Sequence, residues 1–226
     1  MTKEFLKLEN KLVLELEIEP ISPLIIKLGD GSEEENSNKE KSESVISFVT
    51  SDSPRGNLVK YDKNNKSKDC RKGEIFIPGS ALRGLFREKF NKIYDIKKEN
   101  ESNFKEKNKN HKEVDNLFGW IEGEKAQKGR IFIEDAYLEK EELRKNFYLK
   151  NIDEALSEVI MKRDITPIDQ FTGKAVVPLN YECTMEKFET ELIINNISLE
   201  EIKNIFFILR DSYLGEIRLG NSKTRG

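Results

Sequence analysis

Hydrophobic and acidic residues alternate along a short segment near the start of the sequence. From residue 12 to residue 19 the chain reads Leu-Val-Leu-Glu-Leu-Glu-Ile-Glu, so that Leu14, Leu16 and Ile18 are separated by glutamates. A period of two residues is typical of a β-strand that buries one face and exposes the other. The pattern therefore predicts a first strand over residues 12–19, which Pro20 ends.

Two later segments have apolar residues at helical spacing. After the turn-forming pair Pro78-Gly79, apolar residues recur every three or four positions and predict a helix from about residue 80 to residue 94. Ser198 is followed three positions later by Glu201, and this capping-box pair predicts the start of a second helix. The apolar positions that support the two helices are Ala81, Leu82, Leu85, Phe86 and Phe90, and then Ile202, Ile205, Phe206 and Leu209.

Two more strands complete the expected order of elements. Residues 130–134 and 188–194 are rich in strand-forming side chains. The order strand, helix, strand, strand, helix predicts an α+β fold with a ferredoxin-like or RRM-like βαββαβ core, whose last strand is missing before Gly226. The edge of the first strand is then left open, so we expect either residues beyond Gly226 or a strand from another chain.

Long polar insertions interrupt this order. Residues 29–72 and 95–115 are rich in Gly, Ser, Asn, Glu and Lys and show little hydrophobic periodicity. Loops of this length are unusual inside a compact domain and are often functional. We therefore expect one domain over residues 1–226 with insertions at these two places.

Charge and composition narrow the possible functions. The chain has 39 basic and 42 acidic residues and a net charge of −3, so it lacks a general basic field, and any nucleic-acid site must be local. No apolar run approaches the roughly 18 residues that a membrane span needs, so we expect a cytoplasmic protein without a membrane partner. Cys70 and Cys183 lack the paired spacing of a zinc or redox motif and are interpreted as ordinary thiols.

Four sequence blocks indicate a family. Residues 77–84 read Ile-Pro-Gly-Ser-Ala-Leu-Arg-Gly, and residues 117–119 read Leu-Phe-Gly ahead of Gly-Arg-Ile-Phe-Ile-Glu-Asp-Ala at 129–136. Residues 168–175 read Ile-Asp-Gln-Phe-Thr-Gly-Lys-Ala, and residues 214–226 form a glycine-rich end. In this order the blocks resemble those of CRISPR-associated RAMP proteins, which carry an RRM-like domain. The second and third blocks are more similar to the backbone subunits of type III effectors than to guide-processing endonucleases.

The resemblance implies RNA contacts at the start of the first helix. Ser80 offers a hydroxyl beside free backbone N–H groups, where the positive end of the helix dipole favours a phosphate. Arg83 and Arg87 lie four residues apart on one helix face and would hold neighbouring phosphates. Without the resemblance, Ser80 is better explained as a helix N-cap and the two arginines as solvated surface residues.

Two further segments supply candidate RNA contacts through the same resemblance. The cations of the glycine-rich end are Arg218, Lys223 and Arg225, although a glycine-rich turn after a helix is more often a structural connection. Residues 161–182 correspond to the hairpin thumb of backbone subunits, which intercalates in the guide–target duplex. Gln170 departs from the family, whose backbone subunits often carry Arg at this position. The thumb candidates are Lys162, Arg163, Phe171 and Lys174, and Phe171 is equally consistent with packing.

Catalysis by the chain would depend on an aspartate. RNA-cleaving members of the family resemble one another in placing an Asp between the first strand and the first helix, where it would support metal-assisted cleavage with Mg²⁺ or Mn²⁺. Asp52 and Asp30 are the main candidates, and Asp62 and Asp69 are less favoured ones. Asp52 is favoured as metal ligand because a proline turn and an extended run follow it. All four are also explained as solvated turn residues. The only histidine, His111, lies in a Lys/Asn-rich segment that is a poor platform for acid–base catalysis.

The resemblance implies an RNA-binding subunit of a type III interference complex that holds guide RNA, presents or helps to cut target RNA, and packs against other RAMP-type CRISPR subunits. The alternatives are a guide-RNA-processing endoribonuclease of the same superfamily and a non-catalytic assembly scaffold. Metal-dependent, spaced cuts in complementary RNA would indicate an endoribonuclease within the assembly. Metal-independent cutting of repeat RNA would indicate guide processing, and a lack of RNA binding would indicate a scaffold.

Overall fold

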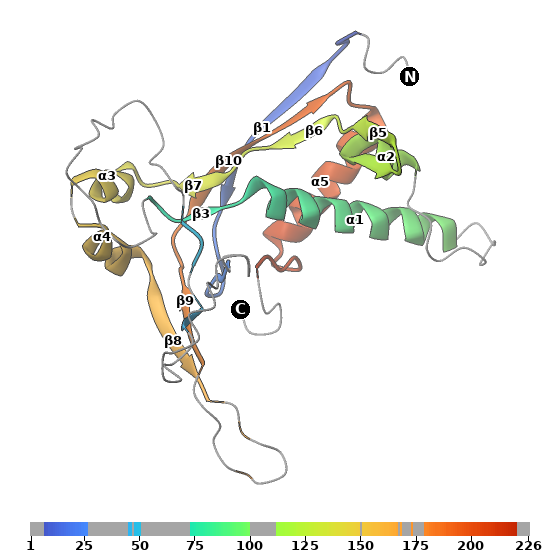
Figure 1. The fold of residues 1–226 in the computed structure, drawn as a ribbon. Coiled ribbons are helices and arrows are strands. Elements are labelled where there is room, and N and C mark those ends of the chain that lie inside the picture. Colours follow the sequence, from blue (N-terminus) through green and yellow to red (C-terminus); the bar gives the residue numbers. More distant parts are fainter. Residues whose placement is uncertain are drawn as a thin grey trace. The chain divides into compact units, whose positions relative to one another are not determined.

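The computed structural model describes residues 7–26, 45–46, 48–50, 73–99, 112–149, 151–166, 168, 173 and 179–220. The strands in these ranges are β1 (Lys11–Ile18), β2 (Val45–Ile46), β3 (Phe76–Ile77), β4 (Gly119–Glu122), β5 (Lys125–Lys128), β6 (Ile131–Ile133), β7 (Ala136–Leu138), β8 (Met161–Ile165), β9 (Leu179–Cys183) and β10 (Phe188–Asn195). The helices are α1 (Gly79–Glu99), α2 (Lys112–Phe118), α3 (Glu141–Leu149), α4 (Ile152–Val159) and α5 (Leu199–Tyr213). Figure 1 shows their arrangement.

The chain divides into two compact units. The first unit comprises Met1–Leu16, Pro78–Ala136 and Thr190–Leu219, and the second comprises the rest of the chain, Glu17–Ile77, Tyr137–Glu189 and Gly220–Gly226. β1, β7 and β10 each contribute residues to both units. The single domain over residues 1–226 stays a prediction.

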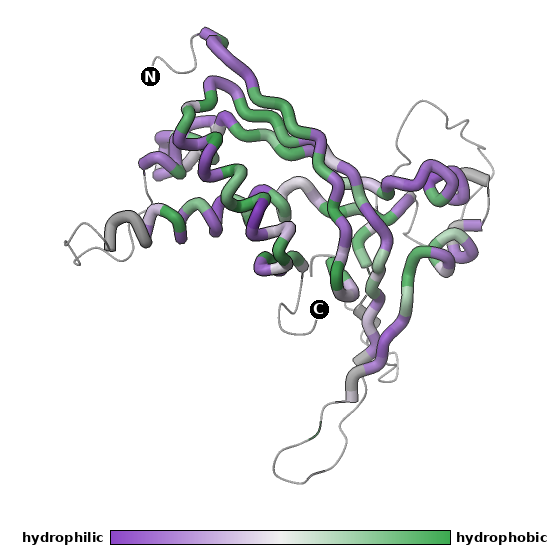
Figure 2. Tube along the Cα trace, turned by 180° about the vertical axis from the view of Figure 1, so that it is seen from behind, coloured by the Kyte–Doolittle hydropathy of each residue, from purple (hydrophilic) through white to green (hydrophobic). Residues whose placement is uncertain are grey.

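In the first unit, β1 and β6 are both neighbours of β10 in the sheet. β6 runs antiparallel to β10, with Ile133 opposite Leu192 and Ile131 opposite Ile194. One face of this sheet packs against α1 and α5 in a single hydrophobic cluster, to which Phe90 and Ile205 contribute nearly inaccessible side chains. The strands are largely hydrophobic along their central parts (Figure 2). In α1 and α5, hydrophobic and hydrophilic residues alternate, as they do in amphipathic helices.

The predicted regular elements of the first unit are confirmed. The strand expected at 12–19 is β1, the strands expected at 130–134 and 188–194 are β6 and β10, and the helix after Ser198 is α5. The capping box is present in both directions, because the Ser198 side chain accepts from Glu201 N and the Glu201 side chain accepts from Ser198 N. The fold is α+β, as predicted, and its sheets are mainly antiparallel. The ferredoxin-like assignment stays a prediction.

Several elements depart from what the hydrophobic pattern indicated. The segment 95–115, expected to be a polar loop, is helical at both ends, since α1 extends to Glu99 and α2 begins at Lys112. Short amphipathic segments explain the miss: α2 buries Val114 and Leu117 but offers too few residues for a periodic signal. The segment 29–72 contains β2, and the helices α3 and α4 had no counterpart in the sequence prediction.

The second unit contains a separate three-stranded sheet in which β9 lies between β2 and β8. β8 and β9 form an antiparallel pair that runs from Met161 opposite Cys183 to Ile165 opposite Leu179. Figure 1 shows this pair as an elongated ladder. Among the helices of the described ranges, none has the length and apolar character that a membrane crossing requires.

Candidate nucleic-acid interface

The N-terminus of α1 holds a carboxylate from its own chain. The helix begins at Gly79, and the Pro78 carbonyl accepts from Ala81 N at 2.9 Å. Gly79 N donates to Asp135 Oδ1 at 2.7 Å, so a negative charge already lies at the positive end of the helix dipole. Ser80 is exposed and is the second residue of the helix, which begins one residue earlier at Gly79. The N-cap interpretation of Ser80 is therefore wrong.

Gly79 is required by the close approach of two backbones. A Cβ atom at this position would overlap the Ile133 carbonyl oxygen and would lie 2.9 Å from the Glu134 carbonyl carbon. Real Cβ atoms essentially never come this close to backbone atoms. The glycine of the first sequence block is thus fixed by packing against β6, and its backbone N–H binds Asp135 of the second block.

Arg83 lies against the end of α2. Its guanidinium donates to the carbonyl oxygen of Phe118, the last residue of that helix, where orphan carbonyls favour a cation. Gly129 allows this arrangement, because a Cβ there would lie 2.6 Å from the Phe118 carbonyl carbon and 2.8 Å from the Arg83 guanidinium. The first block and both parts of the second therefore meet at one structural junction.

Arg87 also contacts α2. Its guanidinium forms an ion pair with Asp115 Oδ1 at 2.9 Å, and the two side chains are 36% and 18% exposed. The helix face that carries Arg83 and Arg87 is therefore turned towards α2, and neither arginine is simply solvated. A phosphate that binds here must share or displace these internal partners.

Arg130, the second residue of the block at 129–136, is a buried cation that the sequence prediction did not single out. Its guanidinium pairs with Glu201 of α5 and donates to the carbonyls of Asn116, Asn195 and Asn196. These bonds join the end of α2, the end of β10 and the start of α5. The sequence did contain a signal for this site, because Arg130 follows a glycine and begins an apolar strand. A cation buried at such a position must be paired, so a partner for Arg130 could have been predicted.

Two glycines of the C-terminal block, Gly215 and Gly220, have structural roles. Gly215 has a φ of 74° and follows α5, where Glu216 N donates to Asp211 O as the helix ends. Gly220 has a φ of 100°, and a Cβ there would lie 2.5 Å from the Ile25 carbonyl oxygen. Arg218 is exposed, and the predicted contacts Lys223 and Arg225 lie outside the described residues.

The β8–β9 pair carries the two thumb candidates that the structure describes. Lys162 and Arg163 are both exposed and, as consecutive strand residues, place one cation on each face of β8. On β9, the buried Glu182 accepts from Phe48 N at 2.9 Å, which ties β9 to the chain after β2. Burial raises the pKa of the Cys183 thiol against the opposing effect of the Arg163 charge, so Cys183 is an ordinary buried thiol, as expected.

Several predicted site residues lie outside the described residues. Besides Lys223 and Arg225, they are Asp30, Asp52, Phe171 and Lys174, together with the less favoured Asp62 and Asp69. Among the residues that the structure does describe, there is no group of three or more His, Cys, Asp or Glu side chains that could hold a metal ion. The catalytic and metal-binding roles of Asp52 and Asp30 therefore stay predictions.

Comparison with known proteins identifies the family. None of the curated proteins compared with the chain matches it. The model of the RAMP superfamily matches residues 17–226, which include all four sequence blocks and nearly the whole chain. RAMP proteins are CRISPR-associated and generally bind RNA and other CRISPR subunits. The chain therefore belongs to the CRISPR-associated RAMP superfamily.

Proposed function

We propose that the chain is an RNA-binding subunit of a type III CRISPR interference complex, in which it holds guide RNA and helps to present or cut complementary target RNA. The observation that carries this proposal is the family match over residues 17–226. The block order supports the type III assignment, because the Asp-Ala and Thr-Gly-Lys-Ala blocks resemble those of backbone subunits.

The β8–β9 pair is the part of the described structure best suited to an RNA contact. Lys162 and Arg163 are exposed on opposite faces of β8, so cations are available on both sides of the ladder. A cation on each side suits a hairpin that enters a duplex, because it meets phosphates of both neighbouring segments. Phe171 and Lys174 follow in the sequence between the two strands and would supply stacking and a further cation.

The arginines of α1 contribute less to RNA affinity in this proposal. Arg83 already donates to the Phe118 carbonyl, and Arg87 is paired with Asp115. A phosphate could bind only those guanidinium N–H groups that Phe118 and Asp115 do not already engage. The carboxylate of Asp135 at the helix start also repels an anion. We therefore propose that Arg83 and Arg87 chiefly support the fold of the first unit, and that RNA affinity depends more on Lys162 and Arg163.

The test is a charge reversal on β8 with a matched control. Lys162→Glu with Arg163→Glu should weaken binding of guide RNA, measured by fluorescence anisotropy, and should reduce the slope of log K against log salt by about 1 to 2. Lys140→Glu with Lys145→Glu makes the same charge change at two exposed lysines near and on α3 and should have a much smaller effect. Equal losses in both variants, or none in the first, would contradict the proposed contact.

Target cleavage is a finer part of the proposal. We propose that Asp52, or else Asp30, holds a Mg²⁺ or Mn²⁺ ion in the assembled complex and so supports scission of the target strand. Guide processing is the weaker alternative, because His111 and its polar surroundings offer no preorganised acid or base.

A further inference from the structure

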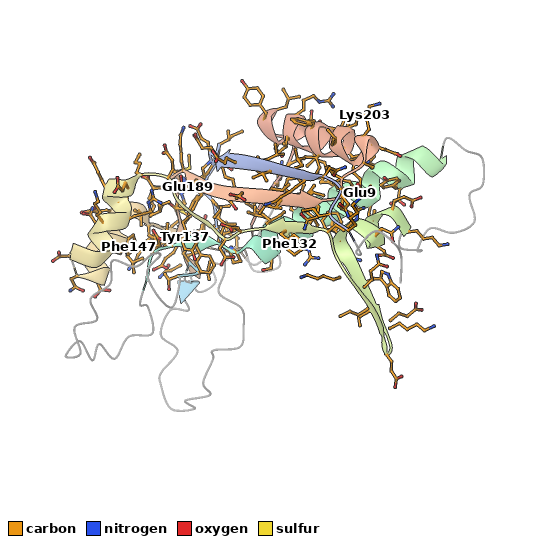
Figure 3. All side chains as sticks on the ribbon, turned by 90° about the horizontal axis from the view of Figure 1, so that it is seen from above. Glu9, Phe132, Tyr137, Phe147, Glu189 and Lys203 are labelled. Carbon is orange, nitrogen blue, oxygen red and sulfur yellow. The ribbon has the colours of Figure 1, made fainter. Side chains whose placement is uncertain are left out.

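The outer side of α5 exposes large apolar side chains. Ile205 and Ile208 lie on the inner side of the helix and belong to the core of the first unit. On the outer side, Leu199 is 69% exposed, Phe206 52% and Tyr213 88%. Figure 3 shows Lys203 on the side of α5 that faces away from β1 and β10. Apolar side chains gathered in this way on the surface are typical of a contact with another protein.

The exposed residues follow the spacing of a helix–helix seam. In order, the residues of this α5 seam are Leu199, Lys203, Phe206, Arg210 and Tyr213. Their separations are four, three, four and three residues, which is the heptad alternation of packed helices. Residues at this spacing stay on one side of a helix, here over about 21 Å. The α5 seam therefore matches the edge of a second helix better than it matches a strand or a loop.

The helix that carries the seam is already well formed. A capping box at Ser198 closes its N-terminus, and Leu214 N donates to Arg210 O at the other end. Its inner side is held by the core cluster. A partner therefore meets a preformed surface and does not have to order it, which lowers the cost of binding.

The two cations of the α5 seam differ. The Arg210 guanidinium lies 2.9 Å from Asp211 Oδ1 and 4.3 Å from the centre of the Phe207 ring, so its charge is already used within α5. Lys203 is exposed and lies between Leu199 and Phe206 along the seam. An amine placed among apolar side chains favours a partner that brings a carboxylate to it, because pairing offsets the cost of removing the amine from water.

We propose that the α5 seam docks an amphipathic helix of a different protein. This helix packs apolar residues on Leu199, Phe206 and Tyr213 and places an acidic residue against Lys203. Phe207 and Leu214, which are also exposed, widen the apolar surface on one side of the seam. Burial of these side chains supplies the affinity, and the pair with Lys203 sets the register of the partner helix.

A second copy of the chain is a poor occupant. Two α5 seams in parallel would bring Lys203 against Lys203. In the antiparallel arrangement centred on Phe206, Lys203 would lie close to Arg210 of the other copy. Like charges meet in both arrangements, and such contacts are costly. RNA also fits less well than a helix, because Arg210 is already paired and Lys203 is the cation that the seam has left for a phosphate.

The first test uses two synthetic helical peptides of three heptads with leucine along the seam. One carries a glutamate at its central seam position, and the other carries a lysine there. By fluorescence anisotropy, the wild-type chain should bind the glutamate peptide at least about tenfold more tightly than the lysine peptide. Lys203→Glu should reverse this preference, because the opposite charges are then exchanged.

Two variants serve as controls for this test. Phe206→Ser should weaken binding of both peptides at least about tenfold without a charge change. Lys125→Glu makes the same charge change as Lys203→Glu at an exposed lysine of β5 and should leave both affinities unchanged. A glutamate peptide that does not bind, or a preference that Lys203→Glu does not alter, would overturn the proposal.

The second test identifies the natural occupant. A photoreactive benzoylphenylalanine replaces Phe206, and the complex is irradiated and purified from the native host. Mass spectrometry should find cross-links to a helical segment of another protein that has an acidic residue within an apolar seam. Cross-links to RNA, to a second copy of the chain, or to no protein would overturn the proposal. Lys162→Glu with Arg163→Glu should leave peptide binding unchanged, so a failure of the proposed RNA contact is distinguishable from a failure of this one.

Discussion

Among the polar side chains that the structure describes in the first unit, Arg130 should make the largest contribution to stability. Arg130→Met keeps most of the length of the side chain but removes the guanidinium. Glu201 then loses its cation while its side chain is only 10% exposed, although it still accepts from Ser198 N at 2.8 Å. The carbonyls of Asn195 and Asn196 also lose a donor.

The magnitude follows from the burial of the pair. Breaking a buried ion pair by removing one partner costs about 3–5 kcal/mol, since the remaining charge is uncompensated. A domain of ordinary stability unfolds with about 5–15 kcal/mol, so Arg130→Met should remove a large part of it. Arg87→Met is the matched control, because its ion pair with Asp115 is more exposed and should contribute only about 1 kcal/mol or less.

Urea denaturation followed by fluorescence of Trp120 measures the effect, since this sole tryptophan lies on β4 in the first unit. The double variant Arg130→Met with Glu201→Gln should be more stable than Arg130→Met alone, because it removes the uncompensated charge and keeps an acceptor for Ser198 N. A loss below about 1 kcal/mol for Arg130→Met, or no recovery in the double variant, would refute the reasoning.

Three further predictions concern the glycines of α1, the buried Tyr94 and the candidate catalytic aspartates. Gly79→Ala should lower the free energy of unfolding by at least about 2 kcal/mol, because the new Cβ would overlap the backbone of β6. Gly84 has open space around it, so Gly84→Ala should raise the free energy of unfolding by about 0.5–1 kcal/mol in the same urea assay. Burial, with help from nearby glutamates, raises the pKa of Tyr94 to about 12, so the unfolded chain loses this proton first and stability should fall as the pH rises from about 10 to about 12. Tyr94→Phe should remove that part of the fall, and an unchanged pH profile would contradict it. If the assembled complex cuts target RNA, Asp52→Ala should abolish cutting and leave RNA binding intact. Cutting that survives in Asp52→Ala but is lost in Asp30→Ala would assign the metal-binding role to Asp30. Cutting that survives in both variants would mean that the chain is purely structural.

The main elements of the first unit could be predicted because each has a strong local pattern. β1 alternates over eight residues, and α5 has both a capping box and an apolar stripe. α2, with seven residues, and β7, with three, are too short for periodicity to identify, and their formation depends on the packing of Val114 and Ala136 in the folded unit.

The candidate site was harder to predict than the fold. The sequence blocks were correctly found, but the partners of their residues depend on long-range contacts. Arg83 meets Phe118 across 35 positions and Gly79 meets Asp135 across 56, and no spacing rule connects such pairs. A motif residue whose side chain holds the fold together cannot be told from one that holds a ligand until these contacts are known.

The most direct test of the central claim is to purify the chain from its native host and sequence the RNA that stays bound. We predict guide RNA in stoichiometric amount, together with other RAMP-type subunits, and much less RNA on the variant Lys162→Glu with Arg163→Glu. A chain that carries no RNA, or equal amounts of unrelated cellular RNA on the wild type and the variant, would contradict the account.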